Sequence, residues 1–449
     1  MSALARYFKD KGSVVKGYDK TPTILTRQLE AEGISVNYDD KIDLLDKEAE
    51  LVIFTPAIPK THRQFNYYMD NQYRVLKRSE VLGMISNNGY SICVAGTHGK
   101  TTISTMIAHI LEDSNYGCTA FLGGISVNYS TNYWSGNDRV FVVEADEYDR
   151  SFLKLQPDVA VISAIDSDHL EIYGNHEGLE KGFTDFAGKI KAGGLLISKY
   201  GLKSSKDLNA SKHLRYSLIN TEADIYASNI TVKNGSYHFD IMQTDLEIQK
   251  FILNIGGLHN IENAIAAISV ARYLKIPNVS IKKAINSFKG VKRRFEYVIS
   301  PESKVIQIDA HSNMIFIDDY AHHPEELRSL ILSARDLFAN RLCTIIFQPH
   351  LFSRTKYFYK EFASALDLAD EVILLPIYPA RELPVEGVTS ELILNEMLLT
   401  RKRILDKDQL ITWIKTNPKL DVLITAGAGD IDQLVEPIKN TLNKLNNFE

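Results

Sequence analysis

The sequence predicts an α/β protein of three domains, each built on a mostly parallel sheet. Short apolar runs alternate with helix-like patterns almost throughout its 449 residues, which is typical of strands joined by crossover helices. The length and the 45% hydrophobic content allow two or three buried cores. The run "SICVAGTHGKTTISTMIAHIL", from Ser91 to Leu111, gives a strand, a turn with glycines and a helix, in the order that a phosphate-binding loop requires.

The first part, to about residue 89, opens with a helical pattern and continues with the strands "SVVKGYD" and "LVIFTPAIP". Asp19 ends the first of these strands, where a nucleotide-binding fold often places an acid toward a ribose, although an ordinary turn aspartate explains it equally well. A doubly wound nucleotide domain starts with a strand and a glycine-rich turn, yet Met1 already lies at the start of the first helix. We therefore expect this domain to lack its first strand.

The second part, about 90 to 294, opens with the phosphate loop. Gly96 and Gly99 allow close backbone approach, Lys100 can reach the outer phosphates, and the Thr101 hydroxyl can ligate magnesium. The match to G-x-x-x-x-G-K-[ST] is incomplete, because Val94 holds the place of the first glycine, and a structural turn is the alternative. Five apolar residues of the following helix share one face, which predicts packing on the sheet: Ile103, Met106, Ile107, Ile110 and Leu111.

Carboxylates follow the next two apolar strands of this part. In "FVVEAD", Glu144 ends the apolar strand and Asp146 lies beyond it, and magnesium beside a phosphate loop needs a carboxylate near the carboxyl ends of the strands. The strand "VAVISAIDSDH" ends in Asp166, Asp168 and His169. His169 suits a second metal or a phosphate oxygen, but a histidine in a loop is more often an ordinary polar contact.

Further polar residues occur later in the chain. Asn260 and Asn263 lie three apart on one helix, where their amides suit an adenine edge, although, taken alone, helix capping is the better explanation of Asn260. In the third part, 295 to 449, Tyr320 and His322 follow a strand, and Arg354 is expected in the loop after the next one. Taken alone, these three read as polar surface loops.

Composition and charge exclude several classes of protein. The formal charge is -5, with 51 basic and 56 acidic residues mixed along the chain, which argues against nucleic acid as a partner. No apolar run reaches a membrane span, and charges interrupt the N-terminus where a signal peptide is apolar, so we expect a cytoplasmic protein. Cys93, Cys118 and Cys343 are an odd number in apolar surroundings, which predicts reduced core thiols.

Together these motifs resemble the Mur ligases, and most of all the branch that adds L-alanine to UDP-N-acetylmuramate. The resemblance spans almost the whole chain in family order, through "GTHGKTT", "EADEYD", "DSDHLEIYG", "LHNIENAIAA", "KRRFE", "DDYAHHPEE", "FQPHLFSRT", "YPARELPVEGVTS" and "AGAGDI". It implies a Rossmann-like UDP-sugar domain at 1–89, a central P-loop ATPase domain at 90–294 and a C-terminal Rossmann-like amino-acid domain at 295–449.

The resemblance also implies a reaction in peptidoglycan precursor synthesis. ATP with magnesium would phosphorylate the muramyl carboxylate, and the amine of L-alanine would attack the acyl phosphate. By position, Lys100, Glu144 and His169 would be catalytic, with Thr101, Glu144 and His169 at the metal. The other implied contacts are Gly96, Thr97, His98, Gly99, Lys100, Thr101, Thr102, Asn260, Asn263 and Arg293 or Arg294 for ATP; Tyr320, His322 and Arg354 for alanine; and Asp19, Thr55, Arg78, His98, Gly123 and Gly124 for the UDP-sugar.

The chain departs from the family in three places, and other functions stay open. The glycine-rich opening would precede Met1, Leu351 replaces a second arginine of some relatives, and no lysine, Lys181 included, can be assigned as a carbamoylated metal bridge. The alternatives are a murein-peptide recycling ligase that attaches a tripeptide, a P-loop nucleotide-binding protein without ligase chemistry, and a damaged form of the ligase. The sequence does not predict an oligomeric state.

Overall fold

The structure, a computed structural model, forms two compact units, each with its own core. It describes residues 1–136, 139–166, 170–202, 208, 210–243, 249–301, 307–309, 312–380, 382–417 and 420–446. Unit 1 comprises Met1–Ser228, Ile241–Gln249 and Glu262–Ile285, and unit 2 comprises Asn229–Asp240, Lys250–Ile261 and Asn286–Glu449. None of the helices in the described part of the chain combines the length and the apolar character that a membrane span needs.

The first ninety residues form two separate pairs of parallel strands, β1 with β2 and β3 with β4. The sequence pattern predicts one doubly wound sheet here, but the strand that joins the two halves of such a sheet is its central first strand. Helix α1 packs through Ala3 and Leu4 into the core of unit 1. The elements are α1 Ser2–Asp10, β1 Lys16–Tyr18, α2 Ile24–Ala31, β2 Ser35–Asn37, η1 Ile42–Leu44, β3 Val52–Phe54, α3 Arg63–Asp70, β4 Val75–Lys77 and α4 Arg78–Ser86.

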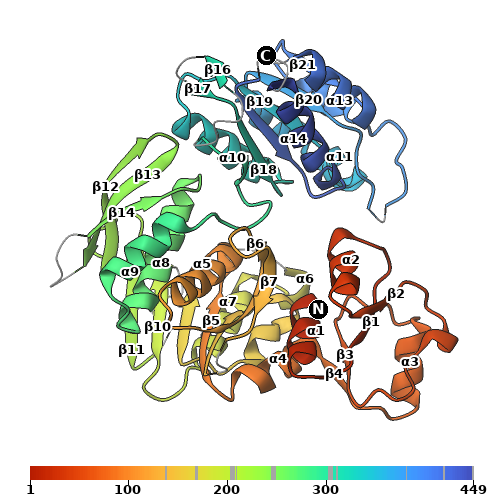
Figure 1. The fold of residues 1–449 in the computed structure, drawn as a ribbon, viewed down its shortest axis with the longest axis vertical. Helices are drawn as coiled ribbons and strands as arrows, with labels where there is room; N and C mark the ends of the chain where they lie inside the picture. The colour runs from red at the N-terminus through yellow and green to blue at the C-terminus, as the bar shows by residue number, and fades with distance from the viewer. Residues whose placement is uncertain are drawn as a thin grey trace. The chain divides into compact units, whose positions relative to one another are not determined.

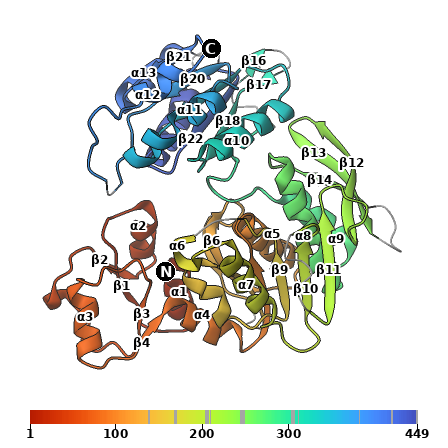
Figure 2. The ribbon, with the colours of Figure 1, turned by 180° about the vertical axis from the view of Figure 1, so that it is seen from behind.

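A ten-stranded sheet, in the order β14-β13-β12-β11-β10-β9-β5-β8-β6-β7, forms the middle of the chain. Figures 1 and 2, from opposite sides, show α5, α8 and α9 on one face and α7 on the other. The elements are β5 Tyr90–Ala95, α5 Lys100–Asp113, β6 Thr119–Ser126, β7 Thr131–Trp134, β8 Val140–Glu144, η2 Tyr148–Lys154, β9 Val159–Ile162, α6 Leu170–Tyr173, α7 His176–Ala187, β10 Leu195–Lys199, β11 Lys212–Ser217, β12 Ile225–Lys233, β13 Ser236–Gln243, β14 Gln249–Leu253, α8 Leu258–Tyr273 and α9 Asn278–Ser287.

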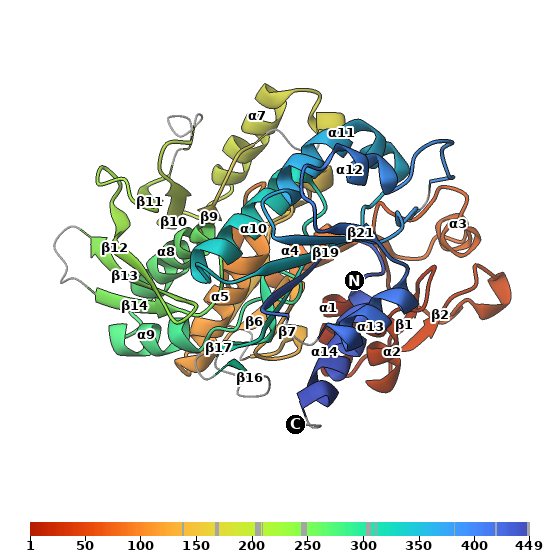
Figure 3. The same ribbon diagram turned by 90° about the horizontal axis from the view of Figure 1, so that it is seen from above.

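The sheet of unit 2 has the order β15-β18-β22-β19-β20-β21, in which β15 alone is antiparallel to its neighbour. Figure 3 shows α10, α11 and α12 on one face and α13 and α14 on the other. The elements are β15 Glu296–Ile299, β16 Gln307–Asp309, β17 Ser312–Asn313, β18 Ile315–Asp319, α10 Pro324–Leu337, β19 Cys343–Phe347, α11 Phe352–Leu366, β20 Glu371–Leu374, α12 Glu391–Glu396, β21 Lys402–Ile404, α13 Lys407–Thr416, β22 Val422–Ala426 and α14 Asp432–Asn446.

Several predictions about the cores are confirmed. The five apolar residues of α5 are all buried, as their helical spacing predicts. Cys93, Cys118 and Cys343 are buried free thiols, and burial raises their pKa values, that of Cys93 and of Cys343 to about 12. These cysteines are therefore parts of the cores and are protonated at neutral pH.

Candidate active site

The phosphate loop lies between β5 and α5, as the sequence predicts. Two glycines have backbone angles that other residues avoid: Gly96 has φ 136° and Gly99 has φ 81°. A β-carbon on Gly96 would collide with the Ser163 hydroxyl, and one on Gly99 would lie 2.6 Å from Oδ1 of Asn263. Both glycines are required because other chain segments approach the loop closely.

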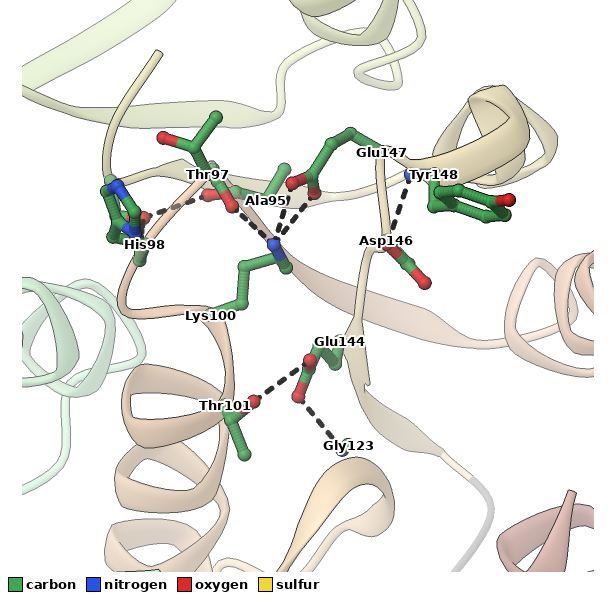
Figure 4. A network of polar contacts seen from close by, with 12 residues as sticks. Ala95, Thr97, His98, Lys100, Thr101, Gly123, Glu144, Asp146, Glu147 and Tyr148 are labelled. Carbon is green, nitrogen blue, oxygen red and sulfur yellow. Dashed lines mark hydrogen bonds and ion pairs between the residues drawn. The ribbon is translucent and has the colours of Figure 1, made fainter. Parts of the chain in front are cut away.

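Lys100, the first residue of α5, folds back over the loop. Its Nζ donates to the Gly96 carbonyl at 2.7 Å and to Oε1 of Glu147 at 2.9 Å, and Oε2 of Glu147 lies 2.8 Å away. Figure 4 shows the ammonium pointing to the Glu147 carboxylate. The charge that the sequence assigns to the outer phosphates is thus paired inside the protein.

Thr101, the residue after Lys100, forms a second contact, with Glu144 (Figure 4). The Thr101 hydroxyl donates to Oε1 of Glu144 at 3.0 Å, and the Gly123 amide donates to Oε2 at 2.9 Å. Strands β5 and β8 are parallel, with Val94 aligned to Glu144, so the carboxylate lies at the edge where the loop begins. Burial raises the pKa of Glu144, and the Thr101 hydrogen bond and the Lys100 charge partly oppose that shift.

The far side of the loop is attached to the segment after β9. The Thr97 amide donates to the Ala164 carbonyl at 3.1 Å, and the Thr97 hydroxyl accepts from the Asp166 amide at 3.1 Å. The Ser163 hydroxyl donates to the carbonyls of Ala95 and His98. His98 is exposed, with Nε2 at 3.6 Å from Oδ2 of Asp166. The loop follows β5, and residues at the ends of β8 and β9, the two strands that flank β5, hold it in place.

The predicted nucleotide asparagines are buried in α8. Asn260 donates to the Gly256 carbonyl at 2.5 Å from inside the helix, which begins at Leu258, so it is not the cap. Asn263 approaches Gly99 at the loop, and Thr102 lies in the first turn of α5. Asp168 and His169 lie outside the described residues.

The residues predicted for the UDP-sugar lie in the first ninety residues and in β6, apart from His98, which lies in the phosphate loop. Thr55 follows β3 and Arg78 follows β4, and because these strands are parallel with Phe54 aligned to Lys77, the two residues share one edge. Asp19 accepts from the Thr21 amide at 3.2 Å, which is the turn contact that the alternative interpretation predicts. Gly123 and Gly124 lie in β6, and a β-carbon on Gly123 would collide with the Glu144 carboxylate.

In unit 2, Arg293 and Arg294 differ in their contacts. Arg293 donates from Nε to Oδ2 of Asp318 at 3.2 Å and from Nη2 to the Gly427 carbonyl. Its guanidinium carbon lies 5.2 Å from the ring centre of Tyr320, and that of Arg294 lies 5.8 Å from it. Burial raises the pKa of Asp318 to about 7, although Arg293 opposes the shift. Arg293 therefore has a structural role, whereas Arg294 has no such carboxylate partner among the contacts of the described residues.

Tyr320, His322 and Arg354 are brought together in unit 2. Nδ1 of His322 lies 2.9 Å from the Tyr320 carbonyl, and its ring lies 6.1 Å from that of His350. Burial lowers the pKa values of His322 and His350, and the Arg354 charge lowers them further. Nη1 of Arg354 and Nδ1 of His350 are buried without a hydrogen-bond partner among the described residues. An anion that bridges them would satisfy both atoms.

The prediction that Arg354 lies in a loop is wrong, because α11 begins at Phe352 and contains it. Leu351, with φ 71°, turns the chain sharply after β19. The free amide of Ser353 in the first turn then donates to Oε2 of Glu382 at 2.9 Å. The early helix start fixes Arg354 on a regular element.

Sequence reasoning missed Glu147, Ser163, His350 and Tyr378. Glu147 follows the strand that carries Glu144, but the pattern does not distinguish which acid in "EADEYD" faces the loop. Tyr378 stacks on His350 with ring centres 5.8 Å apart. His350 follows β19 and Tyr378 follows β20, so the contact joins segments that are distant in the sequence. The motifs "FQPHLFSRT" and "YPARE" contain both residues but do not predict that they touch.

Comparison with known proteins gives matches to Mur ligases along the chain. The family descriptions "Mur ligase family, catalytic domain", "Mur ligase middle domain" and "Mur ligase, glutamate ligase domain" match residues 1–90, 94–271 and 293–429. UDP-N-acetylmuramate--L-alanine ligase from Christiangramia forsetii is 44% identical over 98% of this chain and 95% of its own length. The enzyme of the same name from Phocaeicola vulgatus is 44% identical over 99% of this chain and 96% of its own.

Solved structures share the fold. UDP-N-acetylmuramate-alanine ligase from Thermotoga maritima has a TM-score of 0.82 at 25% identity, covering 99% of this chain and 96% of that one. A murein peptide ligase from Psychrobacter arcticus has a TM-score of 0.66 at 24% identity, covering the same shares, and this likeness shows the fold alone.

Proposed function

The chain belongs to the Mur ligase family, and from that premise we propose that it joins L-alanine to the carboxylate of UDP-N-acetylmuramate with ATP, in peptidoglycan precursor synthesis. The relatives with 44% identity over nearly the whole chain are named for this reaction. A carboxylate resists amines at neutral pH, so its phosphorylation to an acyl phosphate is the chemical reason for ATP. A cytoplasmic location remains a prediction.

The phosphate loop serves the ATP half of the reaction. Backbone amides at the start of α5 bind the phosphate oxygens, and Lys100 offsets the negative charge that develops as the phosphoryl group moves. Asn263, and with it Asn260, contacts the nucleotide from α8. Arg294 rather than Arg293 is the arginine that serves the nucleotide, because Arg293 is paired with Asp318.

The chemistry of Thr101 and Glu144 fits a magnesium ion. Their oxygens are 3.0 Å apart beside the loop, and hydroxyl and carboxylate oxygens are the ligands that this ion prefers. Magnesium, when bound, would neutralise phosphate charge during transfer. His169, the third expected ligand, lies outside the described residues.

The amino-acid half rests on Arg354, whose Nη1 is buried and has no hydrogen-bond partner in the described part of the chain; within unit 2, this observation carries the proposal. A guanidinium suits the carboxylate of an amino acid. Tyr320 and His322, with ring centres 5.1 Å apart, lie near Arg354, whose charge acts on His322. The UDP-sugar is assigned to Asp19, Thr55, Arg78, His98, Gly123 and Gly124.

Phosphate release from MgATP tests the function directly. With UDP-N-acetylmuramate present, we expect release only when L-alanine is added. Release with a free tripeptide but not with alanine would instead identify a recycling ligase. Release that needs neither muramyl nor amino-acid substrate would identify a nucleotide hydrolase and contradict the ligase proposal.

A further inference from the structure

We propose that Glu147 is a positioning residue for the phosphate-loop lysine, and that it holds the Lys100 ammonium in the orientation needed during phosphoryl transfer. The inference rests on the proposed function, since it concerns the same ATP site. Glu147 is fully buried and its carboxylate contacts Lys100 with both oxygens, at 2.9 and 2.8 Å. The Lys100 side chain is 15% exposed.

The geometry leaves Lys100 one direction in which to donate. An ammonium has three N-H donors and no acceptor. The Gly96 carbonyl takes one at 2.7 Å and the Glu147 carboxylate takes another. Among the described residues the structure gives Lys100 no other hydrogen-bond acceptor, so the third N-H is available to a phosphate oxygen. Two fixed contacts thus orient the remaining donor.

Glu147 and Glu144 have separate roles. Glu144 binds the Thr101 hydroxyl and the Gly123 amide, whereas Glu147 pairs with Lys100 (Figure 4). A buried carboxylate is costly unless it is paired, so Glu147 and Lys100 depend on each other. Glu147 therefore positions Lys100, and Glu144 is the carboxylate at the proposed metal site.

The turn that carries Glu147 is strained and braced. Asp149 and Arg150 both have φ 53°, a left-handed conformation that costs about 1 kcal/mol or more for a residue with a β-carbon. The Tyr173 hydroxyl donates to the Glu147 carbonyl at 2.7 Å, and Lys77 pairs with Asp149 at 3.0 Å. Only the Tyr173 contact is made to Glu147 itself, so it holds this residue beneath the loop, whereas the Lys77 pair is made to another residue of the turn.

The first test is Glu147→Gln, which keeps the shape and removes the charge. Lys100 would be less firmly oriented, so we expect kcat for phosphate release to fall about tenfold or more. The affinity for MgADP should not weaken, and a gain of about threefold is expected, because a negative charge near the phosphates is lost. This split between kcat and nucleotide affinity is one that a merely structural role would not produce.

Asp149→Asn is the matched control in the same turn. It breaks the pair with Lys77 without touching Lys100, so kcat and MgADP affinity should stay within twofold of wild type even where the unfolding temperature falls. Glu147→Asp is the second variant, to be used if the glutamine variant does not fold. It keeps the charge but withdraws the carboxylate, and should lower kcat with MgADP affinity unchanged.

Two results would overturn the inference: kcat within twofold of wild type in the glutamine or aspartate variant, or MgADP binding that weakens in step with kcat. The MgADP titration needs no amino acid, and the affinity of the Lys100→Ala variant is the reference for binding without the lysine. If wild-type phosphate release proves independent of alanine, the proposed function fails, yet the same two measurements still decide the role of Glu147.

Discussion

At the scale of single residues, Lys100 is the charge on which phosphate binding depends most. Lys100→Ala removes that charge and leaves Glu147 buried without its cation, so we expect phosphate release to fall at least about a hundredfold. Steady-state kinetics with saturating alanine measures this effect. Activity near that of wild type would show that the loop is not the ATP site.

Arg354 gives a different kinetic signature. Arg354→Ala removes the guanidinium that we assign to the alanine carboxylate, and we expect the KM for alanine to rise about tenfold or more with little change in the KM for ATP. Arg328→Ala, at a half-buried position of α10 whose side chain contacts Ser364, is the control and should leave both constants unchanged. An effect confined to ATP would place the amino-acid pocket elsewhere.

The sequence predicts residues that act through local geometry better than residues that act through distant contacts. Lys100 and Thr101 follow from a strand, a turn and a helix read in order. Glu147 and His350 do not, because their partners, Lys100 and Tyr378, lie 47 and 28 positions away in the sequence. Folding decides which of several adjacent acids or histidines faces inward.

At the scale of elements, the junction between the phosphate loop and α5 leaves no space for a side chain. Gly99→Ala would strain a left-handed backbone by about 1 kcal/mol and press on Asn263, so we expect a tenfold or greater loss of activity. Gly193→Ala is the matched control: its φ is 78°, but no atom of the residues that the structure describes lies within 4 Å of the added carbon. Equal activity losses in the two variants would mean that backbone strain at a left-handed glycine, inside or outside the loop, is enough to cause the loss and that the approach of Asn263 adds nothing.

The order of elements in the two large sheets follows from the alternation of apolar runs and helical patterns, but their ends do not. Arg354 was predicted in a loop, yet the Leu351 turn and the Glu382 carboxylate allow α11 to begin before it. The first ninety residues likewise form two small sheets where one was predicted, because the apolar pattern of a strand does not tell which other strand it pairs with. Tertiary contacts therefore set both the boundaries and the pairing.

At the scale of the whole molecule, each unit has its own hydrophobic core, so we expect two unfolding transitions in calorimetry. The phosphate loop lies in unit 1, and a bound ligand stabilises the part that binds it. Of the proposed nucleotide contacts only Asn260 and Arg294 belong to unit 2, so MgADP should raise the transition of unit 1 more than that of unit 2, and Lys100→Ala should abolish that shift. The shift with MgADP therefore identifies which calorimetric transition is that of unit 1, and this is known before any variants are compared.

Asp318 makes the second transition depend on pH in a defined direction. Burial raises its pKa from 3.8 to about 7, so between these values the folded unit 2 keeps a proton that the unfolded chain releases. Unfolding then releases a proton, and this carboxyl makes unit 2 less stable as pH rises through that window. Asp318→Asn removes this contribution, while the neighbouring Asp319, whose pKa burial raises to about 6, keeps its own. The unit 2 transition temperature of the variant should therefore rise relative to that of wild type by several degrees between pH 5 and pH 7.5. The unit 1 transition is the internal control and should not move, and a variant that instead loses ground as pH rises would mean that the pair with Arg293 outweighs the burial of the carboxylate.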